Sequence, residues 1–277
     1  MNKKDWTKRW KEVSNWWGKI DPPWTPSLGE FRIYKSFFNQ IVDFKNKNRK
    51  MLILGATALL RELGDKYGYQ ITLIDINPEM VKEQSKLLDH KIKGERFIKG
   101  DWRKMDKIFK EEKFDLIVGD HAIINVPFKD WDKVYQNIQK LLKPNGRIFW
   151  AATVYNQKKY IHVKDIIENY RPSKSDIDKF FRIYKLFGNP KFHDKNYGFH
   201  FGRADRAIEQ LGEKKGLISK QINEIKLNLG DWTSVMLPQK KFEEFTKKYF
   251  KIVDRKCDKS HLFFKYQQLY FLKHKCK

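Results

Sequence analysis

Side chains able to bind a ligand or move a proton stand within three residues of the ends of short apolar runs of this chain. They are Thr57 after the run 50–54, Asp75 after the run 69–74, and Asp120 with His121 after the run 114–118. Apolar runs of this length predict buried strands, and ligands bind outside the carboxyl ends of strands in open α/β sheets. The carboxylates could hold hydroxyl or amino groups there, and the histidine could accept a proton near neutral pH.

The turn after residues 50–54 consists of Gly55, Ala56 and Thr57, which lead into a predicted helix. A helix N-terminus offers unpaired amide donors, and a glycine lets a ligand approach the backbone without meeting a Cβ. Asp75 lies 75 − 55 = 20 positions after Gly55. At this distance the second strand of a dinucleotide-type fold presents a carboxylate to ribose hydroxyls.

A predicted third strand at 96–99 leads into Asp101 and Trp102. In such a pair, the carboxylate can hydrogen-bond an adenine amine and the indole can stack on the adenine ring. The further candidates for substrate contact are aromatic or histidine side chains outside these strands, namely Trp24, Tyr34, Tyr197 and His200. The spacing of the histidines does not match a metal-binding helix, so no metal site is expected.

The predicted strands alternate with amphipathic helices, which predicts right-handed crossovers and a parallel sheet. Two β-rich runs, 250–256 and 261–272, are typical of an antiparallel pair at the sheet edge. We therefore expect an α/β, Rossmann-like three-layer sandwich with a mostly parallel seven-stranded sheet, an antiparallel C-terminal strand pair and a helical insert. The expected divisions are an aromatic arm and helix (1–49), a cofactor-binding core (50–152), a helical substrate or lid insert (153–240) and a C-terminal completion of the core (241–277).

The composition limits the classes of protein to which this chain can belong. The chain has 277 residues, 40% of them hydrophobic, and two cysteines without a disulfide or metal spacing. It shows neither a leader-like start nor an apolar run of membrane-spanning length, so a cytoplasmic protein is expected. The net charge of +24 would favour nucleic acid, but the lysines are spread through almost every segment. Compositional bias, with each lysine on a solvated face, accounts for the charge better than a nucleic-acid site does.

Taken together, the motifs resemble those of class I S-adenosylmethionine-dependent methyltransferases. The resemblance covers about residues 50–152 and rests on Leu54–Thr57, Asp75–Met80, Gly100–Trp102, Phe114–Asp120 and Leu142–Arg147 in this order. It implies S-adenosylmethionine as cofactor. The implied cofactor contacts are Gly55, Ala56 and Thr57 at the methionine end, Asp75 and Ile76 at the ribose, Asp101 and Trp102 at the adenine, and Asp120 with His121 facing the methyl group.

The first motif departs from the family pattern. It keeps only Gly55 of the usual glycine-rich turn, and Ile53 stands where an acidic residue is common. The partner of the cofactor's amino group is then Asp120 or the N-terminal arm. The turn also resembles the Gly-Ala-Thr-Gly turn of NAD(P)-dependent reductases, although those need further glycines where this chain has Ala58, Leu59 and Leu60.

The expected activity is methyl transfer to an N, O or S nucleophile of a small molecule, with Asp120 and His121 as catalytic candidates and His121 as the base if the acceptor must lose a proton. An RNA methyltransferase, a non-catalytic nucleic-acid binder and a reductase remain alternatives. The sequence does not indicate an oligomeric state.

Overall fold

The computed structural model describes residues 25–41, 46, 48–156, 161–171, 181–226 and 228–275. Seven strands form one sheet in the order β3-β2-β1-β4-β5-β10-β9, and the short β8 pairs with β5. The strands of this sheet are β1 Lys50–Leu54, β2 Gln70–Asp75, β3 Arg96–Lys99, β4 Phe114–Asp120, β5 Leu142–Tyr155, β8 Leu237–Pro238, β9 Phe250–Lys256 and β10 Gln267–His274.

The pairing of the strands sets their directions. The five strands β1 to β5 are mutually parallel, and β10 runs antiparallel to both β5 and β9. The carboxyl ends of β1, β2 and β4 therefore lie at the same edge of the sheet. This topology confirms the predicted Rossmann-like sheet with its antiparallel C-terminal pair.

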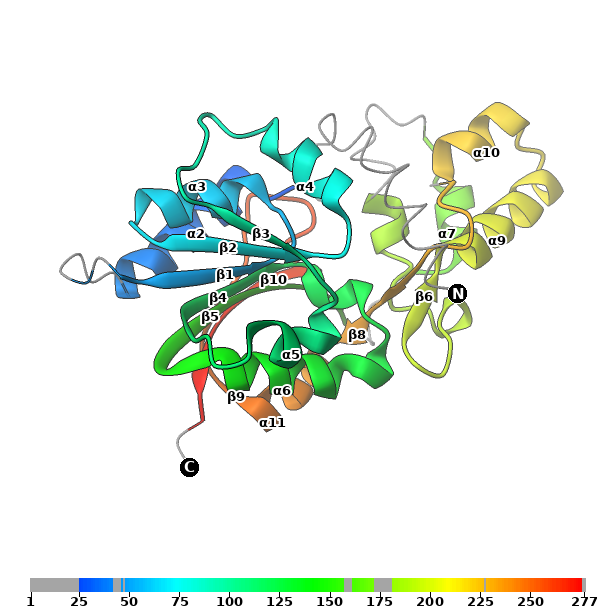
Figure 1. Cartoon of the computed structure of the whole chain (residues 1–277). Coiled ribbons are helices and arrows are strands. Elements are labelled where there is room, and N and C mark those ends of the chain that lie inside the picture. The colour runs from blue at the N-terminus through cyan, green and yellow to red at the C-terminus, as the bar shows by residue number, and fades with distance from the viewer. Residues whose placement is uncertain are drawn as a thin grey trace.

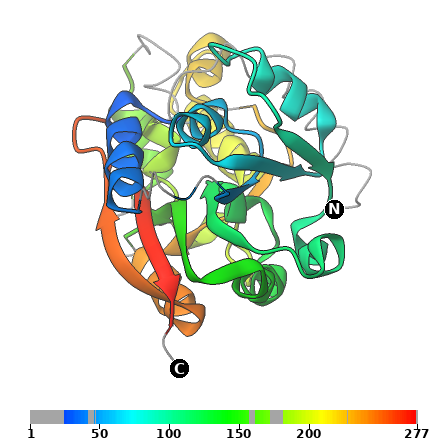
Figure 2. The same cartoon turned by 60° about the vertical axis from the view of Figure 1, so that its left-hand side comes forward.

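Helices cover both faces of the sheet (Figure 1). Those of the sheet layers are α2 Leu28–Ile41, α3 Ala58–Lys66, α4 Pro78–Ser85, α5 Met105–Phe109, α6 Trp131–Leu141 and α11 Gln239–Tyr249. One buried cluster joins α2, α3 and α4 to one face, and another joins α5, α6 and α11 to the opposite face. Figure 2 brings the β10 and β9 edge forward and shows α2 beside it, where the rings of Phe37 and Phe271 lie 5.4 Å apart.

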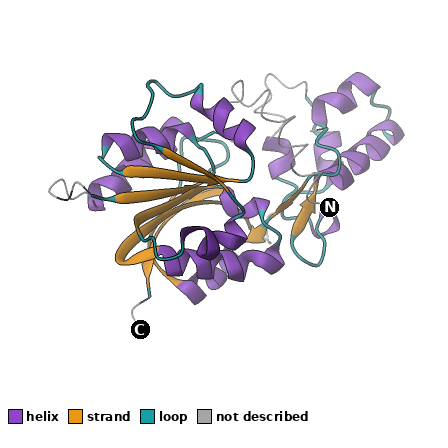
Figure 3. Cartoon of the chain, in the orientation of Figure 1, coloured by secondary structure: helices purple, strands orange, loops and turns teal. Residues whose placement is uncertain are grey.

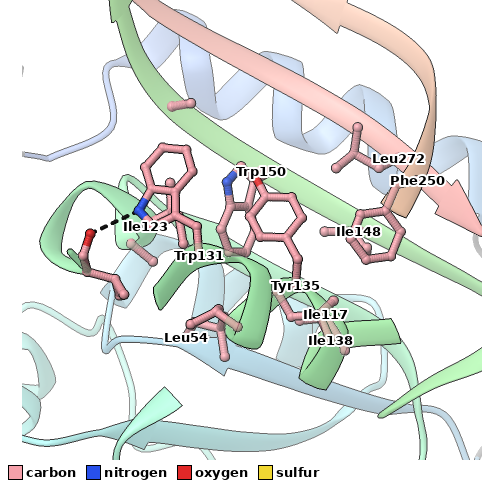
Figure 4. Packing of buried hydrophobic residues seen from close by; sticks show 14 of the residues in the cluster. Leu54, Ile117, Ile123, Trp131, Tyr135, Ile138, Ile148, Trp150, Phe250 and Leu272 are labelled. Atoms are coloured by element: carbon pink, nitrogen blue, oxygen red, sulfur yellow. Dashed lines mark hydrogen bonds between the residues drawn. The ribbon is translucent and has the colours of Figure 1, made fainter. Parts of the chain in front are cut away.

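The face covered by α5, α6 and α11 is packed with aromatic side chains (Figure 4). Trp131 and Tyr135 of α6 are almost fully buried against Trp150 of β5, and the Trp131 indole N–H donates to the Val126 carbonyl at 2.9 Å. A buried indole usually needs such a partner, because an unpaired polar group costs free energy. The bond fixes the loop after β4 to the start of α6.

Residues after β5 form the predicted insert, which has its own buried cluster beyond the carboxyl ends of the strands (Figures 1 and 3). Its described helices and strands are α7 Val163–Glu168, β6 Gly198–His200, α9 Phe201–Lys214, α10 Ser219–Ile225 and β7 Thr233–Val235. The antiparallel pair β6 and β7 was not expected from the sequence. Strand β5 continues to Tyr155, across the expected boundary at 152, and β8 returns from the insert to pair with it.

One expected strand is placed differently. The run 261–272 was predicted to be a strand throughout, but β10 begins only at Gln267. Phe263 is fully buried in the cluster of the insert, and the Phe264 N–H donates to the His261 carbonyl at 3.1 Å. Residues before Gln267 therefore form turns that connect the sheet to the insert.

Candidate active site

Asp120 closes β4 and joins two neighbouring elements. Its Oδ2 accepts a hydrogen bond from the Thr57 hydroxyl at 3.4 Å, and its Oδ1 accepts one from the Tyr34 hydroxyl at 3.4 Å. Thr57 lies in the turn after β1, and Tyr34, which is 1% exposed, lies on α2. Burial raises the pKa of the Asp120 carboxyl to about 7, against the lowering effect of the two hydroxyls.

Asp75 ends β2 beside the same turn. A Cβ on Gly55 would lie 3.9 Å from Asp75 Oδ2, and Gly55 has a φ of +109°, which an L side chain rarely adopts. Burial raises the Asp75 pKa to about 6, although the carboxylate accepts backbone N–H groups, including that of Asn77 at 2.8 Å. The glycine thus leaves an open approach to a largely buried carboxylate.

Asp101 and Trp102 are partly engaged by the protein itself. The Asp101 carboxylate pairs with the Arg103 guanidinium at 2.7 Å, and Arg103 also contacts Asp130 at 2.9 Å. The Trp102 indole N–H donates to the Ile74 carbonyl at 2.8 Å. The Trp102 bond holds the indole beside the end of β2, where the sequence predicts the adenine, and Arg103 holds the Asp101 carboxylate.

His121 follows Asp120 in a left-handed backbone conformation, with a φ of 48°. Its Nδ1 lies 3.0 Å from the Thr153 hydroxyl of β5, and its Nε2 lies 3.9 Å from Asp120 Oδ1. Burial lowers the pKa of His121, and the charge of Glu30 opposes this effect. A histidine held in this way can be neutral and able to accept a proton.

Glu30 is the charged group that sequence analysis missed. It is 4% exposed, and burial raises its pKa to about 7. It forms a capping box with Ser27 at the start of α2: Ser27 N–H donates to Glu30 Oε2 at 2.9 Å, and Glu30 N–H donates to Ser27 Oγ at 3.1 Å. Its place near His121 depends on tertiary packing, which the capping pattern does not reveal.

The remaining candidates contact other residues or lie outside the described residues. Trp24 belongs to a segment that the structure does not describe. Tyr197 packs on Phe128, with ring centroids 5.1 Å apart, and its hydroxyl contacts Lys241. His200 contacts Asp194 at 3.1 Å and Thr233 at 3.3 Å, both within the insert.

Two first-motif positions are buried in the core. Ile53 is fully buried among the side chains of the α2 and α3 face, and Ala56 is 4% exposed in the same cluster. The position where an acidic residue is common is therefore part of the core. Among the described residues, no group of three or more His, Cys, Asp or Glu side chains could hold a metal ion, and no helix is long and apolar enough to cross a membrane.

Comparison with known proteins places this chain in a family. Residues 52–189 match the model of a methyltransferase domain. A stretch of 92 residues is 32% identical to the histidine protein methyltransferase 1 homolog of Dictyostelium discoideum, covering 32% of this chain and 29% of that protein. The chain thus matches under a third of that relative's length.

Solved structures share the fold at low sequence identity. The CcbJ methyltransferase of Streptomyces caelestis has a TM-score of 0.59 at 10% identity, covering 98% of this chain and 99% of that one. A putative zinc-dependent alcohol dehydrogenase from Rhodobacter sphaeroides has a TM-score of 0.60 at 17% identity, covering 97% and 98%. At these identities the likeness shows the fold alone.

The domain match and the sheet topology define the class. The chain belongs to the S-adenosylmethionine-dependent methyltransferases with a Rossmann-like fold, and S-adenosylmethionine is the cofactor of this class.

Proposed function

We propose that this protein transfers the methyl group of S-adenosylmethionine to an N, O or S nucleophile of a small molecule. The observation that supports this best is the meeting of Asp120 with Thr57 and Tyr34 at the carboxyl ends of β4 and β1. Asp120 thus supplies a carboxylate beside the turn after β1, although Ile53, at the position where an acidic residue is common, is apolar. The reacting centre is largely enclosed, since the side chains of Asp120 and His121 are 9% and 16% exposed.

The residues present fit the cofactor. Asp120 would hold its amino group, Asp75 and Ile76 would hold the ribose, and Gly55, Ala56 and Thr57 would line its methionine end. Asp101 and Trp102 would frame the adenine. Within the described part of the chain, no lysine or arginine pairs with Asp75 or Asp120, so both carboxylates can receive donors from a ligand.

The bound cofactor supplies a methyl group on a positively charged sulfur, which is already reactive. The protein then contributes in-line positioning and exclusion of water. His121 Nε2 would take the acceptor's proton where one must leave, because a neutral imidazole is a base near neutral pH. Tyr34, Tyr197 and His200, together with Trp24, remain proposed contacts of the acceptor.

A protein acceptor is the second candidate. It is favoured by the 32% identity, over 92 residues, to a relative whose name describes a histidine protein methyltransferase. A protein side chain would have to enter the enclosed centre beside Asp120 and His121, whereas a small molecule can be enclosed whole.

Methyl labelling distinguishes these acceptors. The protein would be incubated with tritiated S-adenosylmethionine and with separated small-molecule, protein and RNA fractions of cell extract. We expect label in the small-molecule fraction, lost in Asp120→Asn and kept in Asp89→Asn, which alters an exposed carboxylate. Label in protein alone would favour the second candidate, and label in RNA alone would favour a nucleic-acid acceptor.

A further inference from the structure

Glu30 is a buried carboxylate to which the proposed cofactor contacts give no role. Ser27 fixes it through the reciprocal bonds of the helix cap, and the Ser27 hydroxyl donates to Asp258 Oδ2 at 2.6 Å. A capping glutamate satisfies backbone N–H groups equally well at the surface, where its charge remains hydrated. Here it is 4% exposed, and burying a carboxylate is costly unless its charge is balanced.

The helix α2 directs Glu30 toward the end of β4. Tyr34 lies four residues later, on the same helical face, and its hydroxyl reaches Asp120 Oδ1 at 3.4 Å. His121 is the next residue after Asp120. Of the charged groups that act on Glu30, His121 has the largest effect and favours the carboxylate, while Asp120 and Asp258 oppose it. No lysine or arginine in the described segments forms an ion pair with Glu30.

The imidazole of His121 is held from its other side. Thr153, which is 4% exposed, contacts Nδ1, and Thr153 and Gln267 both hydrogen-bond the buried Tyr184 of the insert. When the single hydroxyl proton of Thr153 is donated to Tyr184, its oxygen accepts the Nδ1 proton of His121. Nε2, near Asp120, then carries the free lone pair.

We propose that Glu30 is a positioning residue for methyl transfer and acts through His121, as the counter-charge of the imidazolium. The inference rests on the proposed function, because it requires an acceptor that loses a proton. The acceptor's bond to hydrogen breaks and its proton goes to Nε2. The freed electron pair then bonds to the methyl carbon, and the electrons of the broken carbon–sulfur bond remain on sulfur. The Glu30 carboxylate stabilises the positive ring that results.

Histidine NMR titration tests this without knowledge of the acceptor. The intact protein would be labelled at histidine Cε1, saturated with S-adenosylhomocysteine and titrated, with the His121 signal identified by its loss in His121→Gln. We expect Glu30→Gln, which keeps an oxygen for Ser27, to lower the His121 pKa by about 1, because an opposite charge favours the protonated ring. Asp89→Asn, which alters an exposed carboxylate, is the control and should leave the His121 pKa unchanged.

Glu30→Met provides a second variant without charge if Glu30→Gln does not fold, and it should lower the His121 pKa by the same amount. An unchanged His121 pKa in a folded variant that still binds S-adenosylhomocysteine would overturn the role of Glu30 and leave the proposed function standing. Failure of the unaltered protein to bind S-adenosylhomocysteine would instead contradict the proposed function. With an acceptor from the labelling experiment, Glu30→Gln should also reduce kcat at least tenfold and move the acid limb of the pH profile to lower pH.

Discussion

At the scale of single residues, Asp120 is the carboxylate that we propose to hold the amino group of the cofactor. Its two oxygens accept hydrogen bonds from the hydroxyls of Thr57 and Tyr34, so the carboxylate is oriented before any ligand binds. Ile53, in contrast, is fully buried in the core. An ammonium group beside Asp120 would favour the ionised carboxylate.

This arrangement predicts proton release when the cofactor product binds. The pKa of Asp120 is about 7 in the protein alone, because burial disfavours its charge. We expect the affinity for S-adenosylhomocysteine to fall as pH decreases below about 7, by up to tenfold per pH unit, since binding must then displace a proton. Calorimetry in buffers of different ionisation enthalpy measures this release. Binding of equal affinity at pH 5.5 and pH 8, without proton release, would show that Asp120 does not face the amino group.

The buried carboxyls also predict how the stability of the ligand-free protein depends on pH. The Asp120 pKa is raised from 3.8 to about 7, so the folded state holds a proton that the unfolded state has lost. The stability that this proton confers is present below pH 3.8 and is lost as pH rises toward 7. A difference of one between the folded and unfolded pKa corresponds to about 1.4 kcal/mol.

We therefore expect Asp120→Asn to increase the free energy of unfolding at pH 8 by about 2 kcal/mol, although it weakens cofactor binding. Urea unfolding followed by circular dichroism, at pH 5 and pH 8, measures the effect. The exposed Asp89→Asn provides the control. Lower stability of Asp120→Asn at pH 8 would mean that its hydrogen bonds outweigh the cost of burying the charge.

Residue identity and spacing were enough to name candidates for part of this site. The 20-residue spacing from Gly55 to Asp75 can be read directly from the sequence. In the structure, a Cβ added to Gly55 would lie 3.9 Å from the Asp75 carboxylate. Glu30 could not be found in this way, because it reaches the site through the packing of α2. The Ser-x-x-Glu pattern is the same whether Glu30 only caps the helix or also lies near His121.

At the scale of elements, β4 and β5 position Asp120 through close packing. A Cβ on Gly119 would lie 2.7 Å from Trp150 Cζ3, nearer than real side chains approach. Trp150 is 2% exposed and packs against Tyr135 of α6, so the indole cannot move freely. The absence of a side chain at Gly119 lets the two strands and α6 pack together directly before the catalytic candidates.

Gly119→Ala should therefore reduce stability by about 1–3 kcal/mol, the usual cost of overpacking a core. Because Asp120 is the next residue, affinity for S-adenosylhomocysteine should fall as well. Thermal unfolding and calorimetry measure the two effects, and Trp150→Phe should restore part of the stability in the double variant by removing the indole's second ring. Unchanged stability in Gly119→Ala would show that the ring gives way easily.

Elements with a regular apolar period were predicted well, and those defined by distant pairing were not. The strand Phe250–Lys256 has the predicted bounds. The strand β10 begins at Gln267 because aromatic residues before it, such as Phe263, pack into the insert. The β6 and β7 pair joins residues more than 30 positions apart, which no short-range pattern indicates.

At the scale of the whole molecule, the insert covers the carboxyl edge of the sheet (Figure 1). Its buried cluster includes Tyr155 from the end of β5 and is packed by Ile124 from the loop after β4. The alternation of strands and helices was enough to predict the parallel sheet, since parallel strands need crossover helices. The place of the insert over the site was a hypothesis from its position in the chain alone.

The charge of +24 predicts general attraction to nucleic acid rather than a specific site. Fluorescence anisotropy with a labelled RNA 20-mer should show weak binding that decreases steeply with salt and does not change with S-adenosylhomocysteine. Binding that persists at physiological salt and strengthens with S-adenosylhomocysteine would favour an RNA acceptor over a small molecule.

Calorimetric titration of the protein with S-adenosylhomocysteine, and separately with NADPH, tests the proposed cofactor site most directly. We expect binding of S-adenosylhomocysteine in the micromolar range, no binding of NADPH, and at least a tenfold loss of affinity in Asp75→Ala, since its carboxylate is expected to hold both ribose hydroxyls. Binding of NADPH alone, or an unchanged affinity for S-adenosylhomocysteine in Asp75→Ala, would contradict the proposed cofactor site.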